Sequence, residues 1–238
     1  MRAFFYGVAL QWKIDLRNKG ILITYYLVPL LFFLFIGEIF TSMNPLAKDT
    51  LIQSMTIFAI TMGAFLGTPI PLVELYSGDI KKAYQVGGIP LWTGAANNFI
   101  SAFIHLFITS LIIYTAAFLA FDAKLPEYPL RYFGCLAIFI ITCIAVGSLL
   151  GLFVSNVNKL TMYSQLLFLP SLMLSGIMFP TNMLPGVLEK AGYLFPATWG
   201  LKILTSSHSK LLWFLPLLLF FVGALALGAF KLSRIVKE

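Results

Sequence analysis

Charged residues are scarce in this chain: they make up 11% of its 238 residues, whereas hydrophobic residues make up 60%. Soluble domains are typically about 25% charged and about 45–50% apolar. The shortage of charge therefore excludes an ordinary soluble domain and indicates an integral membrane protein. Apolar runs of about 20 residues, long enough to cross a bilayer, recur along the whole length. They leave no room for a separate soluble domain.

Cysteine is also scarce: the chain has two, Cys135 and Cys143, and both lie in one apolar run. They lie eight residues apart on one predicted helix, too far to bridge each other and without metal-ligand spacing. We interpret both as buried packing residues. No metal site is predicted.

Motifs for catalysis are also lacking. The chain has two histidines, His105 and His208, and no H-E-x-x-H zinc motif. Ser175 does not stand in the Gly-x-Ser context of an intramembrane serine protease. No G-x-x-x-x-G-K-[ST] phosphate loop occurs, and the Gly87-Gly88 pair has no following Lys-Ser/Thr. The sequence therefore argues against an enzyme and predicts no cofactor in this chain.

The apolar runs that are present predict an all-α integral membrane protein with six transmembrane helices in a single domain, 1–238. The spans are placed at 21–40, 51–73, 91–121, 132–154, 160–179 and 211–230, followed by a cytoplasmic tail, 231–238. Lys13, Asp15, Arg17 and Lys19 interrupt the first apolar stretch, so we do not expect a cleavable signal peptide.

Basic residues set the predicted orientation. The net charge of +7 suggests contact with anionic lipid or an acidic partner, and the absence of basic patches interleaved with aromatics argues against nucleic acid. With both termini in the cytoplasm, ten basic residues lie inside and six outside, as the positive-inside rule prefers. The six on the outer side are Lys48, Lys124, Arg131, Lys190, Lys202 and Lys210. We expect a plasma (inner) membrane protein.

Residues 1–20 are predicted to form a separate amphipathic helix. An apolar stripe recurs every four residues, with Lys13 and Arg17 on roughly the opposite side; the stripe consists of Phe4, Val8, Trp12 and Leu16. Such a helix lies in the membrane interface rather than crossing it. The alternative is a frayed cytoplasmic tail.

The loop 74–90, between the second and third spans, contains a second short helix. Asp79 can cap its N-terminal end, and Gly87 and Gly88 end it before the next span. Ile80, Ala83 and Tyr84 give it an apolar face, with Lys81 and Lys82 outside it. Such a helix either lies on the lipid surface or docks into a partner.

The segment 180–200, before the last span, is too short to cross the membrane. Pro170 kinks the fifth span and Pro180 ends it. The next 15 residues, 181–195, reach about 22 Å as a helix, less than the roughly 30 Å apolar core. Because backbone at membrane depth must be helical or buried in protein, we predict short re-entrant helices on the outer side.

These two segments, in this order, resemble those of the permease family of type-2 ATP-binding-cassette (ABC) exporters. Members of that family look like this chain over its whole length. The late signature reads "LSGIMFPTNMLPGVLEKAGYLFPATW" and is carried by Ser175, Gly176, Phe179, Pro180, Met183, Leu184, Pro185, Phe195 and Pro196. The coupling-loop pattern matches Glu74, Gly78, Asp79, Lys81 and Lys82. Leu75 stands where many members have arginine.

The resemblance implies a division of labour between subunits. Two permease subunits, identical or different, would form the pathway, and two separate ATPase subunits would carry ATP and magnesium. The helix within 78–86, with Ile80 and Tyr84, would sit in a cleft of the ATPase and couple its closure to the spans.

Polar residues inside the third span suggest a substrate path. His105 lies near mid-depth, with Asn97 and Asn98 two turns closer to the cytoplasm, and such residues usually face protein or a cavity. His105 either lines the path or is a neutral histidine bonded to a neighbouring helix.

The sequence thus predicts the membrane subunit of an ATP-driven exporter that moves a hydrophobic or amphiphilic substrate outward: a drug, an antimicrobial peptide or a lipid-like molecule. Export of a lipid-linked polysaccharide by the same family is an alternative. An ion-coupled secondary transporter is a second one, although it would be expected to show a carboxylate relay or paired broken helices at mid-membrane.

Overall fold

The computed structural model describes residues 2–43, 48–178, 181–206 and 211–237, and every regular element in these ranges is helical. In chain order they are α1 (Arg2–Arg17), α2 (Lys19–Leu22), the π-helical η1 (Ile23–Leu27), α3 (Val28–Met43), α4 (Leu51–Met62), the π-helical η3 (Gly63–Gly67), α5 (Pro69–Ser77), α6 (Asp79–Val86), α7 (Trp92–Phe121), α8 (Pro129–Phe153), α9 (Val157–Leu174), the 3-10 turn η4 (Thr181–Met183), α10 (Gly186–Gly192), α11 (Pro196–Thr205), the 3-10 turn η5 (Leu211–Trp213) and α12 (Phe214–Lys237).

Five helical stretches in the described residues are long and apolar enough to cross a membrane: Lys19–Ile39, Leu51–Ser77, Trp92–Phe121, Pro129–Phe153 and Leu211–Ile235. They confirm five of the six expected spans. The remaining one corresponds to α9, which has 18 residues and carries Lys159 and Gln165 in its first half. It is not among the five, so the sixfold count stays a prediction.

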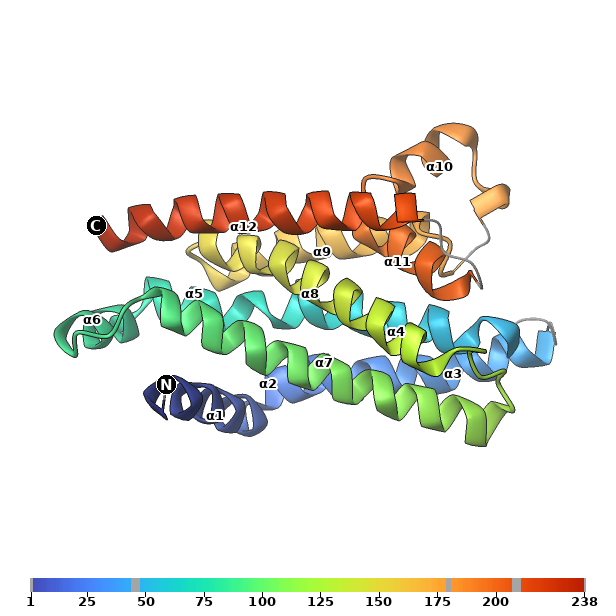
Figure 1. Ribbon diagram of the computed structural model, residues 1–238, viewed down its shortest axis with the longest axis horizontal. Helices are drawn as coiled ribbons and strands as arrows, with labels where there is room; N and C mark the ends of the chain where they lie inside the picture. The colour runs from blue at the N-terminus through green and yellow to red at the C-terminus, as the bar shows by residue number, and fades with distance from the viewer. Residues whose placement is uncertain (1, 44–47, 179–180, 207–210, 238) are drawn as a thin grey trace.

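The long helices lie side by side along one axis (Figure 1). Helix α6 and both ends of the chain lie toward one end of this bundle, and α10 lies at the other (Figure 1). The continuous stretch α4–η3–α5 is the centre, because 83% of its most apolar window is buried, against 17% for the last span. Helix α12 also continues beyond the predicted boundary at Phe230, and Ile235 is buried against Leu91 and Leu152.

Close packing in the centre depends on two glycines of α8, Gly147 and Gly151, four residues apart on one face. A Cβ at Gly147 would collide with the carbonyl of Ala64, and one at Gly151 would lie 2.6 Å from the carbonyl of Pro69. Small residues with this spacing let two membrane helices approach at backbone distance. The backbone of α4–η3–α5 therefore rests directly on α8.

The N-terminal helix α1 packs against α7 (Figure 1). Phe4, Val8 and Trp12 of the predicted stripe are partly buried, whereas Leu16 is exposed. The contacting face instead continues through Asp15, which is 2% exposed. The predicted helix is present, and its place in the membrane interface stays a prediction.

Candidate functional site

Helix α6 begins after the extended residue Gly78 and ends at Val86, two residues before the left-handed Gly88. Gly78 has φ −109° and ψ −173°, and a Cβ there would lie 2.8 Å from the carbonyl oxygen of Glu74. Gly88 has φ +63°, a conformation that glycine adopts at little cost. Asp79 occupies the first turn, where a carboxylate suits the helix dipole, and it pairs with Lys82 at 3.0 Å. Glycines thus define both ends of α6.

The outer surface of α6 is uncovered. None of its residues is buried. Ile80 is 48% exposed and Val86 is 90% exposed, while Asp79 and Lys82 are also on the surface. Figure 1 shows α6 beyond the end of the bundle. An uncovered helix with apolar side chains flanked by charges is suited to contact another macromolecule or a lipid surface.

The base of α6 is braced against the spans. Tyr84 and Tyr76 pack on a small buried cluster of Leu91, Leu152 and Ile235. The Tyr76 hydroxyl also donates a hydrogen bond of 2.8 Å to the carbonyl oxygen of Leu91, which joins the last turn of α5 to the start of α7. A displacement of α6 would therefore move α5 and α7 together.

A buried polar cluster joins α1, η1 and α7 around His105, which is fully buried. Its ring stacks on Trp12, with centroids 4.7 Å apart, and on Tyr25 at 5.3 Å. Its Nδ1 shares a 2.7 Å hydrogen bond with the Tyr26 hydroxyl. Its Nε2 has no hydrogen-bond partner among the described residues and lies 3.9 Å from Oδ2 of Asp15. The side chain is thus enclosed within one chain, and its predicted role in a substrate path stays a prediction.

Asp15 anchors α1 in this cluster. The Ser101 hydroxyl donates to its Oδ2 at 2.6 Å, and Nε2 of Gln11 donates to its Oδ1 at 2.9 Å. Burial raises the pKa of the Asp15 carboxyl above its ordinary value near 3.8, and the two hydrogen bonds partly oppose that rise. Desolvation outweighs the hydrogen bonds because the carboxyl is almost completely covered.

The two asparagines that were predicted with His105 have different surroundings. Asn98 donates a 3.1 Å hydrogen bond to the carbonyl oxygen of Thr68, where η3 meets α5. Asn97 faces Gly7 of α1, and in the part of the chain that the structure describes its Oδ1 has no hydrogen-bond partner. Both side chains are buried. All three residues lie on α7, but Asn98 contacts the central span whereas Asn97 contacts α1.

The late signature begins where α9 ends. Ser175 is buried and donates to the carbonyl oxygen of Leu172 at 3.2 Å. Gly176 has φ +92° and turns the chain. Pro185 directly precedes α10, and Pro196 is the first residue of α11. Pro180 lies outside the described residues. Two short helices are therefore present in the predicted segment, and their re-entrant position stays a prediction.

The family model described as "ABC-2 type transporter" matches residues 2–209. The chain belongs to the ABC-2 type transporter family. The expected family is thereby confirmed, and with it a multi-pass membrane permease that works with an ABC ATPase. No curated protein and no solved structure matches the permease.

Several residues of the permease were missed from sequence. Asp15 was interpreted as one of the charges that interrupt an apolar stretch, yet it lies eleven residues, about three helical turns, after Phe4 on the same face. Gly147 and Gly151 carried a readable signal, the small-x-x-x-small spacing.

Proposed function

We propose that this chain is the membrane permease subunit of an ATP-driven exporter. A second permease, identical or different, completes the pathway, and one of two ATPase subunits docks on α6 of this chain from the cytoplasm while the other docks on the second permease. The substrate, a hydrophobic or amphiphilic molecule, moves outward. Family membership favours this function over the ion-coupled alternative.

The observation that carries the proposal is the uncovered surface of α6. Ile80 projects from a helix without buried residues, and the Tyr76 and Tyr84 contacts link that helix to α5 and α7. An apolar anchor that inserts into a partner supplies a large share of binding energy in protein interfaces. The short braced connection makes α6 suitable for transmitting the movement of a docked ATPase.

The apolar surface of the first span supports the choice of substrate class. An open apolar surface runs along one face of the continuous helical stretch α2, η1 and α3. It consists of Leu22, Ile23, Leu27, Leu30, Leu31 and Leu34, with Lys19 and Tyr26 as the polar members. An amphiphile with an acidic or polar head fits such a surface. A lipid-linked polysaccharide would present a similar lipid end, so this family alternative is retained.

The coupling role is tested with Ile80→Asp. A carboxylate in an apolar docking pocket is expected to weaken ATPase binding at least about tenfold. Val187→Asp is the matched control, since Val187 is 80% exposed on α10 at the other end of the bundle. The measurement is co-purification of a Walker-A ATPase with the tagged chain in mild detergent.

A stoichiometric ATPase that is lost with Ile80→Asp and retained with Val187→Asp is the expected result. Normal ATPase recovery and normal transport by Ile80→Asp would refute the coupling role of α6. Substrate class is measured separately, by ATP-dependent uptake of fluorescent amphiphiles into inside-out vesicles.

A further inference from the structure

Two π-helical turns interrupt the first two spans, η1 in the first and η3 in the second. A proline follows each turn at the same spacing: Pro29 stands two residues after η1, and Pro69 stands two residues after η3. Because proline has no backbone N–H, the helical ladder lacks a donor just beyond each turn. Helices bend at prolines and at π-helical turns. Both spans therefore contain a local bending point, and the second has a further proline, Pro71.

The two bending points lie against each other. The ring of Tyr25 in η1 packs on two glycines of η3: an added Cβ would lie 2.8 Å from Cδ1 of Tyr25 at Gly63, and 2.9 Å from Cε1 at Gly67. The Tyr25 hydroxyl shares a buried 3.1 Å hydrogen bond with the hydroxyl of Thr68. The first span therefore contacts the second at the level where both can bend.

Helix α7 donates a hydrogen bond to each bending point. The Thr109 hydroxyl donates at 2.8 Å to the carbonyl oxygen of Tyr25, which in an α-helix would accept from the N–H that the proline after η1 lacks. The side-chain amide of Asn98 donates at 3.1 Å to the carbonyl oxygen of Thr68. Helix α7 itself is α-helical throughout and contains no proline. It is therefore suited to tilt as one rod that acts on both bending points.

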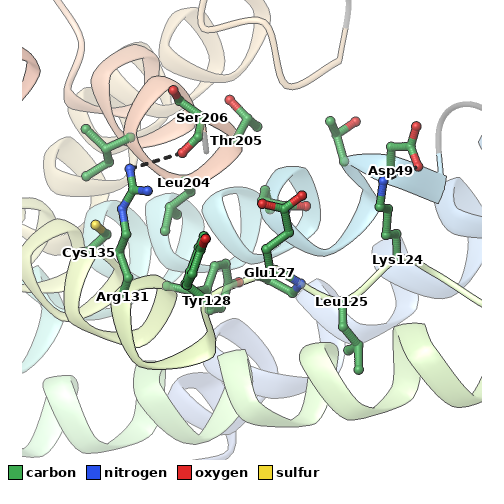
Figure 2. Close-up of a pocket in the computed structure, with 15 residues that line it drawn as sticks. Asp49, Lys124, Leu125, Glu127, Tyr128, Arg131, Cys135, Leu204, Thr205 and Ser206 are labelled. Atoms are coloured by element: carbon green, nitrogen blue, oxygen red, sulfur yellow. Dashed lines mark hydrogen bonds and ion pairs between the residues drawn. The ribbon is translucent and has the colours of Figure 1, made fainter. Parts of the chain in front are cut away.

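The part of the second span beyond its bend, α4, is held at the opposite end of the bundle. The Tyr132 hydroxyl of α8 donates at 3.1 Å to the hydroxyl of Thr56 in α4. The start of α4, the first turns of α8 and the end of α11 also meet around a polar cavity of about 220 Å³ (Figure 2). There Nη2 of Arg131 donates at 3.2 Å to the carbonyl oxygen of Ser206, drawn as a dashed line in Figure 2. These contacts tie α4, α8 and α11 together.

We propose that η1 and η3 form a paired hinge, at which α2 and α5 bend against α3 and α4, and that the Tyr25–Thr68 contact makes the two bends move together. Helix α6 follows α5 and is braced to the start of α7 through Tyr76, so α5, α6 and α7 move as a unit. In transport the hinge converts a displacement of α6 into a tilt of the spans. That consequence rests on the proposed function, whereas the bending itself does not.

Distances between two spin labels in the purified full chain, reconstituted in nanodiscs, measure the bending. One label is placed on α6 at Val86, which is 90% exposed. The other is placed at Asn158, an exposed residue at the start of α9, which is not part of the moving unit. The two native cysteines are buried and are replaced by alanine in this background. A hinge predicts one main distance and a second, less populated one from bent conformers.

Tyr25→Phe keeps the ring and removes the hydrogen bond between the two spans. We expect the fraction of bent conformers to rise about fivefold, the usual effect of losing one such hydrogen bond. Tyr132→Phe is the matched control, because it removes a buried hydrogen bond of the same 3.1 Å length to a threonine of the same span, beyond the bend. An equal rise in both variants, or a single narrow distance in every variant, would overturn the proposal.

Thr68→Val removes the same hydrogen bond from the other side and covers the case in which Tyr25→Phe does not fold. If the bond joins the two bends, the double variant should have no larger effect than one substitution, whereas additive effects would refute that role.

Pro69→Ala tests the hinge with the opposite sign. It restores a backbone donor beyond η3, so the fraction of bent conformers should fall, and a rise would refute η3 as a bending point. These measurements need no ATPase, so they can fail while the Ile80 experiment succeeds, and the reverse is also possible.

Discussion

Replacing Ser101 by alanine is expected to loosen α1 from α7. The Ser101 hydroxyl donates the shorter of the two hydrogen bonds to the Asp15 carboxyl, at 2.6 Å, and both side chains are buried. A hydrogen bond to a charged group contributes about 1.5–3 kcal/mol, and water cannot easily replace this one. The equilibrium for local opening of α1 should therefore shift by about 10- to 100-fold.

Hydrogen–deuterium exchange of the α1 amides measures this opening directly. Ser110→Ala is the matched control on the same helix: Ser110 is also buried, but its hydroxyl donates to the carbonyl oxygen of Leu106 within α7 at 2.7 Å. We expect faster exchange in α1 for Ser101→Ala only, with α8 unchanged in both variants. Equal protection of α1 in the two variants would refute the anchoring role of Asp15.

The same contact predicts a pH dependence with a definite sign. Because burial raises the pKa of Asp15 above its ordinary value near 3.8, the docked state of α1 binds more protons than the undocked state between the two pKa values. Docking therefore weakens as the pH rises through that window and is constant above it. Asp15→Asn should abolish this contribution. Protection of wild-type α1 that increases with pH, after correction for intrinsic exchange rates, would contradict this sign.

Two further predictions concern packing and coupling. Gly147→Ile should lower the free energy of unfolding by about 1–3 kcal/mol or more, because the new side chain would meet the carbonyl of Ala64. Gly134→Ile on the same helix is the control, since this position has open space and the change should be neutral. Thermal unfolding in detergent measures both variants, and equal midpoints would exclude the close approach of the two helices. Tyr76→Phe removes the 2.8 Å hydrogen bond to the carbonyl oxygen of Leu91 and should lower the free energy of unfolding by about 1 kcal/mol. The same thermal assay measures this loss, and substrate stimulation of the ATPase activity should also be reduced. An unchanged unfolding midpoint together with unchanged stimulation would contradict the bracing role of Tyr76.

The sequence located most helices because membrane insertion imposes a simple length rule. Runs of about 20 apolar residues predict spans without knowledge of their neighbours, and five of the expected spans are present. Glycines at 78, 87 and 88 likewise marked the ends of α6, because the conformations of helix ends depend on local backbone preference. The family-specific residues at 175–196 indicated where the late segment lies along the chain, and two short helices, α10 and α11, are found there.

The partners of polar residues could not be predicted in this way. Asp15 and Ser101 are 86 residues apart in the chain, and only the packing of α1 on α7 brings them within hydrogen-bond distance. Gln53 lines a cavity because α4, α8 and α11 meet around it, and no local pattern encodes that meeting. His105 likewise had two interpretations from sequence, and its surroundings of Trp12, Tyr25 and Tyr26 depend on three separate helical segments.

The sequence by itself determined that this protein is helical and membrane-embedded and that a short exposed helix connects its second and third spans. Those properties follow from apolar length, charge placement and helix-end residues, all of which act locally. The tertiary structure alone decided which face of α1 is buried, where His105 lies and which buried acceptors have no donor among the described residues. Those outcomes depend on distant segments sharing one interior, because a hydrogen bond or a cavity requires groups from several helices at defined distances.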